Sequence, residues 1–308
     1  MVYILSKVNV CFKLNGRPRE LTFQNIESTR SNSDGKKLKA PLEVKTSYHT
    51  EHRYIEKTIR KDQFEMEDWM EHFQTILNFR SIDSIIFDLF PTEYDSEDIK
   101  KYFGMPSSLD IEHTGNYAYN QAILQTFLPV ESLIIAPDVF ENSKVPPEIL
   151  IQQFTSLTIV EFMQDDSYPR VVTLDDLLLI NSKSIDVKNA RMGPKDINRF
   201  IKLWQHGANP RMEYIFITYE KEKEDDEETI LKGINYLKIS NEWRSFRFPD
   251  CKKPVEDVFG GIDILRNDGV NATIRFDRAN RYEMFVWFDH CIHEGGTSNL
   301  FRSVSYLA

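Results

Sequence analysis

The stretch Val130–Ile159, VESLIIAPDVFENSKVPPEILIQQFTSLTI, decides the fold because the same short apolar motif stands at both of its ends. V-x-x-L-x-I begins at Val130, and F-x-x-L-x-I begins at Phe154. The central leucines, Leu133 and Leu157, lie 24 positions apart, within the range of roughly 20–29 residues for a leucine-rich repeat. A motif repeated at this distance predicts one strand and one returning segment in each repeat.

The motif continues on both sides when any large apolar residue is allowed at its key positions. Its central anchors are Ile85, Leu109, Leu133, Leu157, Ile185 and Ile215. The segments between them have lengths and apolar spacing typical of helices: 95–103, 116–127, 147–153, 173–180 and 194–204. Strands that alternate with helices predict a parallel sheet with helices on its outer face. Thr173 is predicted to be the N-cap of its helix.

Antiparallel strands are predicted on both sides of the repeats. Alternating apolar residues around Asn15-Gly16 predict a hairpin, and the apolar spacing over 65–77 predicts a helix. Three alternating stretches after Gly261 predict a β meander that caps the last repeat. The predicted fold class is therefore α/β, a leucine-rich-repeat-like curved parallel sheet with outer helices, an N-terminal hairpin and a C-terminal antiparallel β meander.

The expected division of the chain follows from these elements. It comprises an N-terminal β segment over 1–62, a repeat-like α/β body over 63–219, and an acidic loop with the C-terminal β cap over 220–308. The acidic loop is the run Glu220–Glu228, in which no apolar residue offsets the entropy of ordering. The Asn or Cys ladder of ordinary leucine-rich repeats is missing, so we expect irregular turns.

The charge and the apolar runs limit the partners. A net charge of -10 argues against a nucleic-acid partner, because lysine and arginine dominate phosphate binding. No run approaches the ~18 apolar residues that a membrane span needs, and the start of the chain does not resemble a signal peptide. Three widely separated cysteines fit reduced thiols. We therefore expect an intracellular protein, cytoplasmic or nuclear, without a membrane or nucleic-acid partner.

The sequence carries no motif spacing typical of catalysis, because G-x-S-x-G, H-E-x-x-H and C-x-x-C are all missing. We therefore expect no enzymatic activity, no catalytic residue and no cofactor. His290, Cys291 and His293 are residue types that suit zinc. A structural zinc site needs four ligands, however, and the other cysteines bring no paired spacing. The prediction is that no metal is bound.

The sheet face opposite the helices is the predicted binding surface, because residues beside each anchor point away from the core. The residues before the anchors are mostly serines, which leave room for a partner. The predicted binding residues are Ser132, Ile134, Ser156, Thr158, Ser184, Asp186, Tyr214 and Phe216. Two alternatives stand for Tyr214 and Phe216: either the rings are exposed and anchor a partner, or they lie under the C-terminal cap.

Several stretches resemble the nematode F-box-associated family of the second type, and the resemblance covers nearly the whole chain. The stretches that carry it are 174–183, 196–204, 207–214 and the strand after Asp268-Gly269. In the proteins that this chain resembles, an N-terminal F-box binds a Skp-type adaptor of a cullin ubiquitin ligase. The resemblance implies that the remaining region recognises the protein to be ubiquitinated.

The sequence leaves no room for a helical F-box before Val8, so we expect the F-box itself to be missing. Two alternatives follow. Either the chain is the protein-binding recognition domain of a ubiquitin-ligase adaptor, or it is a ligase-independent interaction scaffold or decoy. A protein substrate of unknown identity is expected in both cases, and a Skp-type adaptor only if a missing F-box exists.

Overall fold

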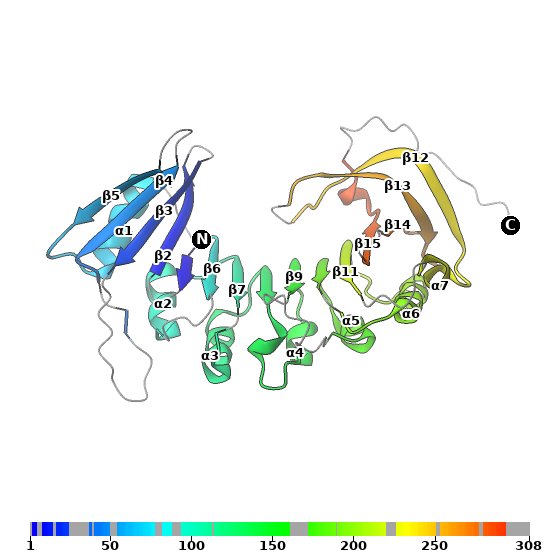
Figure 1. The fold of residues 1–308 in the computed structure, drawn as a ribbon, viewed down its shortest axis with the longest axis horizontal. Coiled ribbons are helices and arrows are strands. Elements are labelled where there is room, and N and C mark those ends of the chain that lie inside the picture. Colours follow the sequence, from blue (N-terminus) through cyan, green and yellow to red (C-terminus); the bar gives the residue numbers. More distant parts are fainter. Residues whose placement is uncertain are drawn as a thin grey trace. The chain divides into compact units, whose positions relative to one another are not determined.

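The computed structural model of this chain has two compact units, Met1–Ser143 and Lys144–Ala308, which are called unit 1 and unit 2 below. It describes residues 2–4, 8–14, 17–24, 37–38, 40–49, 54–77, 82–87, 94–112, 114–160, 172–188, 190–219, 226–250, 253–276 and 280–293. In each unit short strands alternate with helices, and antiparallel strands extend the sheet (Figure 1). Among the helices of these residues, none combines the length and the apolar character needed to cross a membrane.

Unit 1 contains a sheet in which a parallel and an antiparallel part meet at strand β1. Its elements are β1 (Val2–Ile4), β2 (Val8–Leu14), β3 (Arg17–Gln24), β4 (Glu43–His49), β5 (Tyr54–Arg60), α1 (Met66–Leu77), β6 (Ser84–Phe87), α2 (Ser96–Phe103), β7 (Ser108–Ile111), α3 (Tyr117–Phe127), β8 (Ser132–Ile135) and η1 (Pro137–Val139). Strands β1, β6, β7 and β8 pair in parallel in that order. From β1 the sheet continues antiparallel through β2, β3 and β4 to β5. The predicted N-terminal hairpin is confirmed as β2–β3.

Unit 2 has a parallel part followed by antiparallel strands at its C-terminal end. Its elements are α4 (Pro147–Leu150), β9 (Ser156–Ile159), α5 (Leu174–Leu179), β10 (Ser184–Val187), α6 (Pro194–Gln205), β11 (Tyr214–Thr218), α7 (Glu227–Leu231), β12 (Tyr236–Phe246), β13 (Glu256–Leu265), β14 (Asn271–Phe276), β15 (Arg281–Val286) and η2 (Asp289–Cys291). Strands β9, β10 and β11 pair in parallel. Antiparallel β15, β14, β13 and β12 follow β11 in that order. The predicted meander is confirmed as β13–β15, whereas β12 was not predicted.

The predicted anchors pair directly with one another inside each unit. In register, they are Ile85, Leu109 and Leu133 in unit 1, and Leu157, Ile185 and Ile215 in unit 2. All six side chains are 0% exposed. The alternation of parallel strands with helices is therefore confirmed, and the closer relation to leucine-rich repeats stays a prediction.

Helix α6 shows why the helices of unit 2 pack on one face of β9–β11 (Figure 1). Ile197, Phe200, Ile201 and Trp204 are three or four positions apart, so they form one apolar side of the helix. All four are fully buried. Burying a large apolar side chain contributes about 1.5–3 kcal/mol, so this side of α6 holds the helix against the sheet.

Thr173 is the N-cap of α5, as predicted. Its hydroxyl accepts a hydrogen bond from the N–H of Asp176 at 3.3 Å, and the Asp176 carboxylate accepts one from the N–H of Thr173 at 3.0 Å. This capping box satisfies two of the N–H groups that begin the helix. We expect Thr173→Ala to lower the free energy of unfolding by about 1 kcal/mol in urea denaturation, and Thr173→Ser to retain most of it. Equal stabilities of Thr173→Ala and the parent would contradict this role.

The acidic run predicted as a loop ends in a helix. Residues 220–225 of the run lie outside the described residues, but Glu227 and Glu228 form the first turn of α7. Acidic side chains are favoured there because the helix N-terminus carries a partial positive charge. Ile230 and Leu231 follow and are buried. The loop prediction is wrong for these last glutamates, since apolar residues just beyond them anchor the helix.

Candidate functional site

A row of side chains crosses the sheet of unit 2, each paired in register with the next. Thr158 on β9 pairs with Asp186 on β10, and Asp186 pairs with Phe216 on β11. Phe216 then pairs with Glu283 on β15, and Glu283 with Arg275 on β14. We call these five residues the open-face row. All are half-buried, and they lie opposite the buried anchors because side chains alternate along a strand.

Arg275 closes one end of the open-face row by joining two carboxylates. Its Nε donates a hydrogen bond to Oε2 of Glu283 at 3.0 Å, and its Nη2 donates one to Oε1 of Glu256 at 2.9 Å. Burial, and then the charge of Glu283, raises the pKa of Glu256 above its ordinary value. Charge-assisted hydrogen bonds of this kind are stronger than neutral ones, so they hold this end of the row in place.

Asp186, in the middle of the row, has a different environment. Its Oδ1 atom is buried without a hydrogen-bond partner. Burial raises the pKa of Asp186 above its ordinary value, and the charges of Lys188 and Lys253 oppose the rise, whereas that of Glu283 adds to it. A buried acceptor without a partner costs folding free energy and requires an explanation.

We expect Asp186→Asn to raise the free energy of unfolding at pH 7 by about 1 kcal/mol, because it removes a desolvated charge. A carboxyl whose folded-state pKa is raised loses stability as the pH rises through its unfolded and then its folded pKa. The gain should therefore be present at neutral pH and vanish below about pH 4, where the carboxyl is protonated in both states. Urea denaturation across this pH range measures it, and a variant less stable than the parent at pH 7 would refute the expectation.

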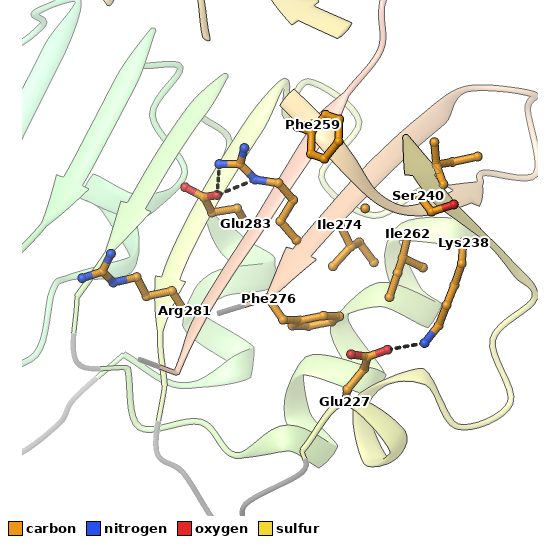
Figure 2. Close-up of a pocket in the computed structure, with 12 residues that line it drawn as sticks. Glu227, Lys238, Ser240, Phe259, Ile262, Ile274, Phe276, Arg281 and Glu283 are labelled. Carbon is orange, nitrogen blue, oxygen red and sulfur yellow. Dashed lines mark hydrogen bonds and ion pairs between the residues drawn. The ribbon is translucent and has the colours of Figure 1, made fainter. Parts of the chain in front are cut away.

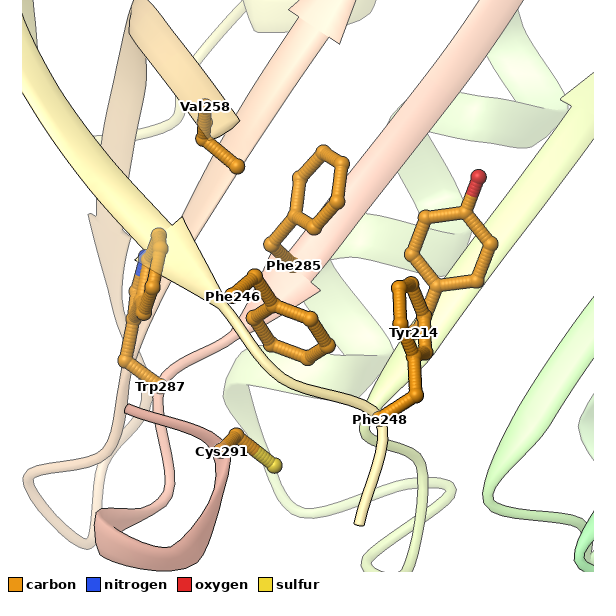
Figure 3. Packing of buried hydrophobic residues seen from close by; sticks show 7 residues of the cluster. All are labelled: Tyr214, Phe246, Phe248, Val258, Phe285, Trp287 and Cys291. Carbon is orange, nitrogen blue, oxygen red and sulfur yellow. The ribbon is translucent and has the colours of Figure 1, made fainter. Parts of the chain in front are cut away.

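Tyr214 is buried, not exposed (Figure 3). Only 6% of its side chain is exposed, and the centroid of its ring lies 5.1 Å from that of Phe285 and 5.3 Å from that of Phe248. Its hydroxyl donates a hydrogen bond to Oε1 of Glu283 at 3.3 Å. The alternative in which the ring lies under the C-terminal cap is therefore right for Tyr214. Phe216 packs against the same cluster but stays half-buried.

The other predicted binding residues differ in how far they can be reached. Ser184 is 3% exposed, because the ammonium of Lys253 donates a hydrogen bond to its hydroxyl at 3.0 Å. Ser156, on β9, is half-buried. Ser132 and Ile134 belong to unit 1, where both lie half-buried on β8. In unit 2, Ser156, Thr158, Asp186 and Phe216 are thus the predicted residues that keep exposed surface.

Glu283, Arg275 and Lys253 were not predicted as site residues. The alternation over 281–286 indicates a strand and shows that Glu283 shares a face with Phe285. It does not indicate that this strand pairs with β11, which places Glu283 beside Phe216. The available signal was the charge of Glu283 and Arg275, which alternate with apolar residues along their strands.

A pocket of about 570 Å³ lies where strands β12–β15 meet α7 (Figure 2). Ile274 contributes to its apolar lining. Glu227 and Lys238 form an ion pair at 2.8 Å on one side, and Arg275 and Glu283 form another at 2.5 Å. These four charged groups of the pocket thus pair with one another, and two of them, Arg275 and Glu283, also belong to the open-face row.

Glu213, His290 and Cys291 bring possible metal-ligand atoms within 4.8 Å of one another. Nε2 of His290 lies 3.0 Å from Oε1 of Glu213, and the ammonium of Lys183 lies 3.2 Å from the same oxygen. Lys183 thus already compensates the negative charge of Glu213, which a metal ion would otherwise need as a ligand. Burial, and then the charge of Glu213, raises the pKa of Cys291 to about 12, so its thiol is protonated at neutral pH. His293, the third predicted zinc-type residue, is exposed.

Comparison with known proteins concerns the same part of the chain. The sequence model of a family described as F-box associated matches residues 145–217. Residues 145–217 are therefore similar to the F-box associated family. The F-box associated region runs from just before α4 to β11 and includes Thr158, Asp186 and Phe216. Glu283 and Arg275, the other end of the open-face row, lie outside it.

A curated relative of this chain comes from Caenorhabditis elegans. It is named "F-box associated domain-containing protein sdz-33" and is 29% identical over 110 residues. The similarity covers 34% of this chain and 35% of the relative, so the chain spans about a third of the length of the curated relative it matches. No solved structure matches the chain. The resemblance to the F-box associated family that the sequence analysis noted is therefore confirmed for residues 145–217.

Proposed function

We propose that this chain is a non-enzymatic protein-interaction domain that binds a partner protein on the open face of unit 2. The observation that carries the proposal is the open-face row. Its half-buried Thr158, Asp186 and Phe216 come from strands paired in register inside the F-box associated region. Sheet faces left open beside stacked helices are common binding surfaces in repeat proteins. A half-buried aromatic ring such as Phe216 is a frequent contact in protein interfaces.

The finer proposal is that the partner is a protein to be ubiquitinated and that the chain is the recognition region of an F-box-type ligase adaptor. Its support is the F-box associated family whose model matches residues 145–217, together with what the sequence resemblance implies. The ligase-independent scaffold keeps the same binding face, and the two alternatives differ only in whether a Skp-type adaptor joins the complex.

The binding face is tested by photocrosslinking with a small diazirine amino acid in the full chain, in nematode cell extract. One variant carries it at Thr158 in the open-face row, and the matched control carries it at Lys195, an exposed residue of α6. We expect protein adducts of defined mass from position 158 and none from position 195. Adducts that form equally at both positions, or only at 195, would place the partner elsewhere and refute the proposal.

The ligase connection is tested separately by co-purification of the full-length gene product with a recombinant Skp-type adaptor. Adaptor retained together with the partner crosslinked at position 158 is the expected result for a ligase adaptor. A partner complex that forms without any adaptor would support the ligase-independent scaffold and exclude the finer proposal.

A further inference from the structure

The open-face row contains a carboxylate whose charge the fold does not fully compensate. Among the described residues Lys188 and Lys253 act on Asp186 through their charges, but neither forms an ion pair with it. Oδ1 of Asp186 is buried and makes no hydrogen bond. By contrast, the neighbouring carboxylate of Glu283 accepts hydrogen bonds from Arg275 and Tyr214. Asp186 is thus the acid of the row that still lacks a donor.

On the same face, a cation already lies against aromatic rings beside Ser184, two residues before Asp186 on β10. The ammonium of Lys253 lies 4.9 Å from the centroid of the Tyr214 ring and 5.2 Å from that of Phe248. It also donates a hydrogen bond to the Ser184 hydroxyl at 3.0 Å. Cations are attracted to the faces of aromatic rings by the ring quadrupole, most strongly when they are desolvated. The geometry shows that a polar strand residue and an aromatic ring on this face together bind a cationic side chain.

Asp186 and Phe216 repeat this combination two residues further along β10 and β11. They are direct partners across the parallel pair, two positions after Ser184 and Tyr214, and therefore on the same face. Ser184 and Tyr214 are covered, at 3% and 6% exposure, but Asp186 and Phe216 are half-buried. The second pair has an acid in place of the serine, and no described cation is in contact with that acid.

We propose that Asp186 and Phe216 receive an arginine side chain of the partner protein, which completes the open-face row. This inference rests on the proposed function and names the chemistry of its central contact. A guanidinium fits better than an ammonium because its planar fork of N–H groups matches a carboxylate while its face stacks on an aromatic ring. Thr158, on the other side of Asp186, supplies a small residue that leaves room for the incoming chain.

The test uses the full chain and arrays of immobilised decapeptides with random flanking residues and one fixed central residue. The fixed residue is arginine, lysine, leucine, or citrulline, which is the uncharged counterpart of arginine. Asp186→Asn removes the charge at the proposed contact. Asp175→Asn, an exposed position in the first turn of α5, makes the same change of charge on the helix side and is the matched control.

We expect the parent to retain arginine peptides at least about tenfold better than citrulline peptides, a difference of about 1.4 kcal/mol. Asp186→Asn should abolish the preference and Asp175→Asn should keep it. Because Asp186→Asn is expected to be at least as stable as the parent, the loss would not reflect unfolding. Equal retention of arginine and citrulline peptides by the parent, or a preference that survives Asp186→Asn, would overturn the inference.

Failure of this inference is distinguishable from failure of the proposed function. The crosslinker at position 158 reports whether any partner occupies the open face, whatever its chemistry. In one outcome, adducts at position 158 persist unchanged in Asp186→Asn while the array shows no arginine preference. That result would support the proposed interaction surface and refute the arginine contact. Absence of adducts at position 158 would instead refute the surface itself.

Discussion

Replacing Phe285 by alanine is expected to lower the free energy of unfolding of unit 2 by about 3–5 kcal/mol. Phe285 is fully buried in an aromatic cluster, with ring centroids 5.3 Å from Phe246 and 5.1 Å from Tyr214. The guanidinium of Arg275 lies 5.0 Å from the centroid of its ring. Rigid rings cannot collapse into the space that Phe285 would leave, so most of the cavity cost remains.

The matched control is Phe259→Ala, which removes the same side chain from the same sheet where it is 45% exposed. Its ring contacts mainly Trp243, at 4.6 Å between centroids, and we expect it to cost less than about 1 kcal/mol. Hydrogen exchange of β13–β15 peptides at increasing urea concentrations measures both variants. Equal losses from the two variants would show that the cluster around Phe285 is not what stabilises unit 2.

The same Phe285 variant links stability to the binding face. Phe285 stands two residues after Glu283 on β15, on the same side of the strand. A loosened cluster should therefore displace Glu283, and with it the end of the open-face row nearest Arg275. Crosslinking at position 158 in Phe285→Ala is expected to weaken even where the variant is still folded.

The repeats could be predicted from the sequence because their geometry is local. Anchors such as Leu157 and Ile185 recur at short, regular distances, and each helix between them is amphipathic over its own few turns. Parallel strands joined by one helix have few ways to pair, so the register of the anchors followed. Thr173 was predictable for the same reason, since a capping box is set within four residues.

The way in which the C-terminal strands cover part of the open face could not be predicted, because it depends on residues far apart in the chain. The hydrogen bond between Tyr214 and Glu283 joins residues 69 positions apart, and alternation along β15 does not specify which strand it pairs with. The burial of Tyr214 and the position of Lys253 both follow from that pairing. The unsatisfied oxygen of Asp186 had no sequence signal at all, because an aspartate in a strand is usually solvated.

Asp263→Leu is expected to destabilise unit 2 by about 3–5 kcal/mol, because it leaves the buried guanidinium of Arg244 without its partner. The side chains of Arg244 and Asp263 are only 6% and 16% exposed. They form two parallel hydrogen bonds, each 2.9 Å long, between β12 and β13. Asp263 also accepts a hydrogen bond from the Thr273 hydroxyl at 2.6 Å, so its loss affects β14 as well.

The double variant Arg244→Met with Asp263→Leu decides what the ion pair contributes. Removing both charges leaves no uncompensated ion, and an apolar pair of similar volume often restores the stability lost in the single variant. We therefore expect the double variant to recover most of the loss in urea denaturation, with a coupling free energy of about 2–3 kcal/mol. Lys238, on the same strand β12, forms an exposed ion pair with Glu227 of α7, and Lys238→Ala should cost less than about 1 kcal/mol. The ring centroid of Trp287 lies 5.1 Å from the Arg244 guanidinium. A double variant as unstable as Asp263→Leu alone would therefore show that the loss comes from the hydrogen bond to Thr273 or from packing against Trp287. The unpaired charge would then not be its cause.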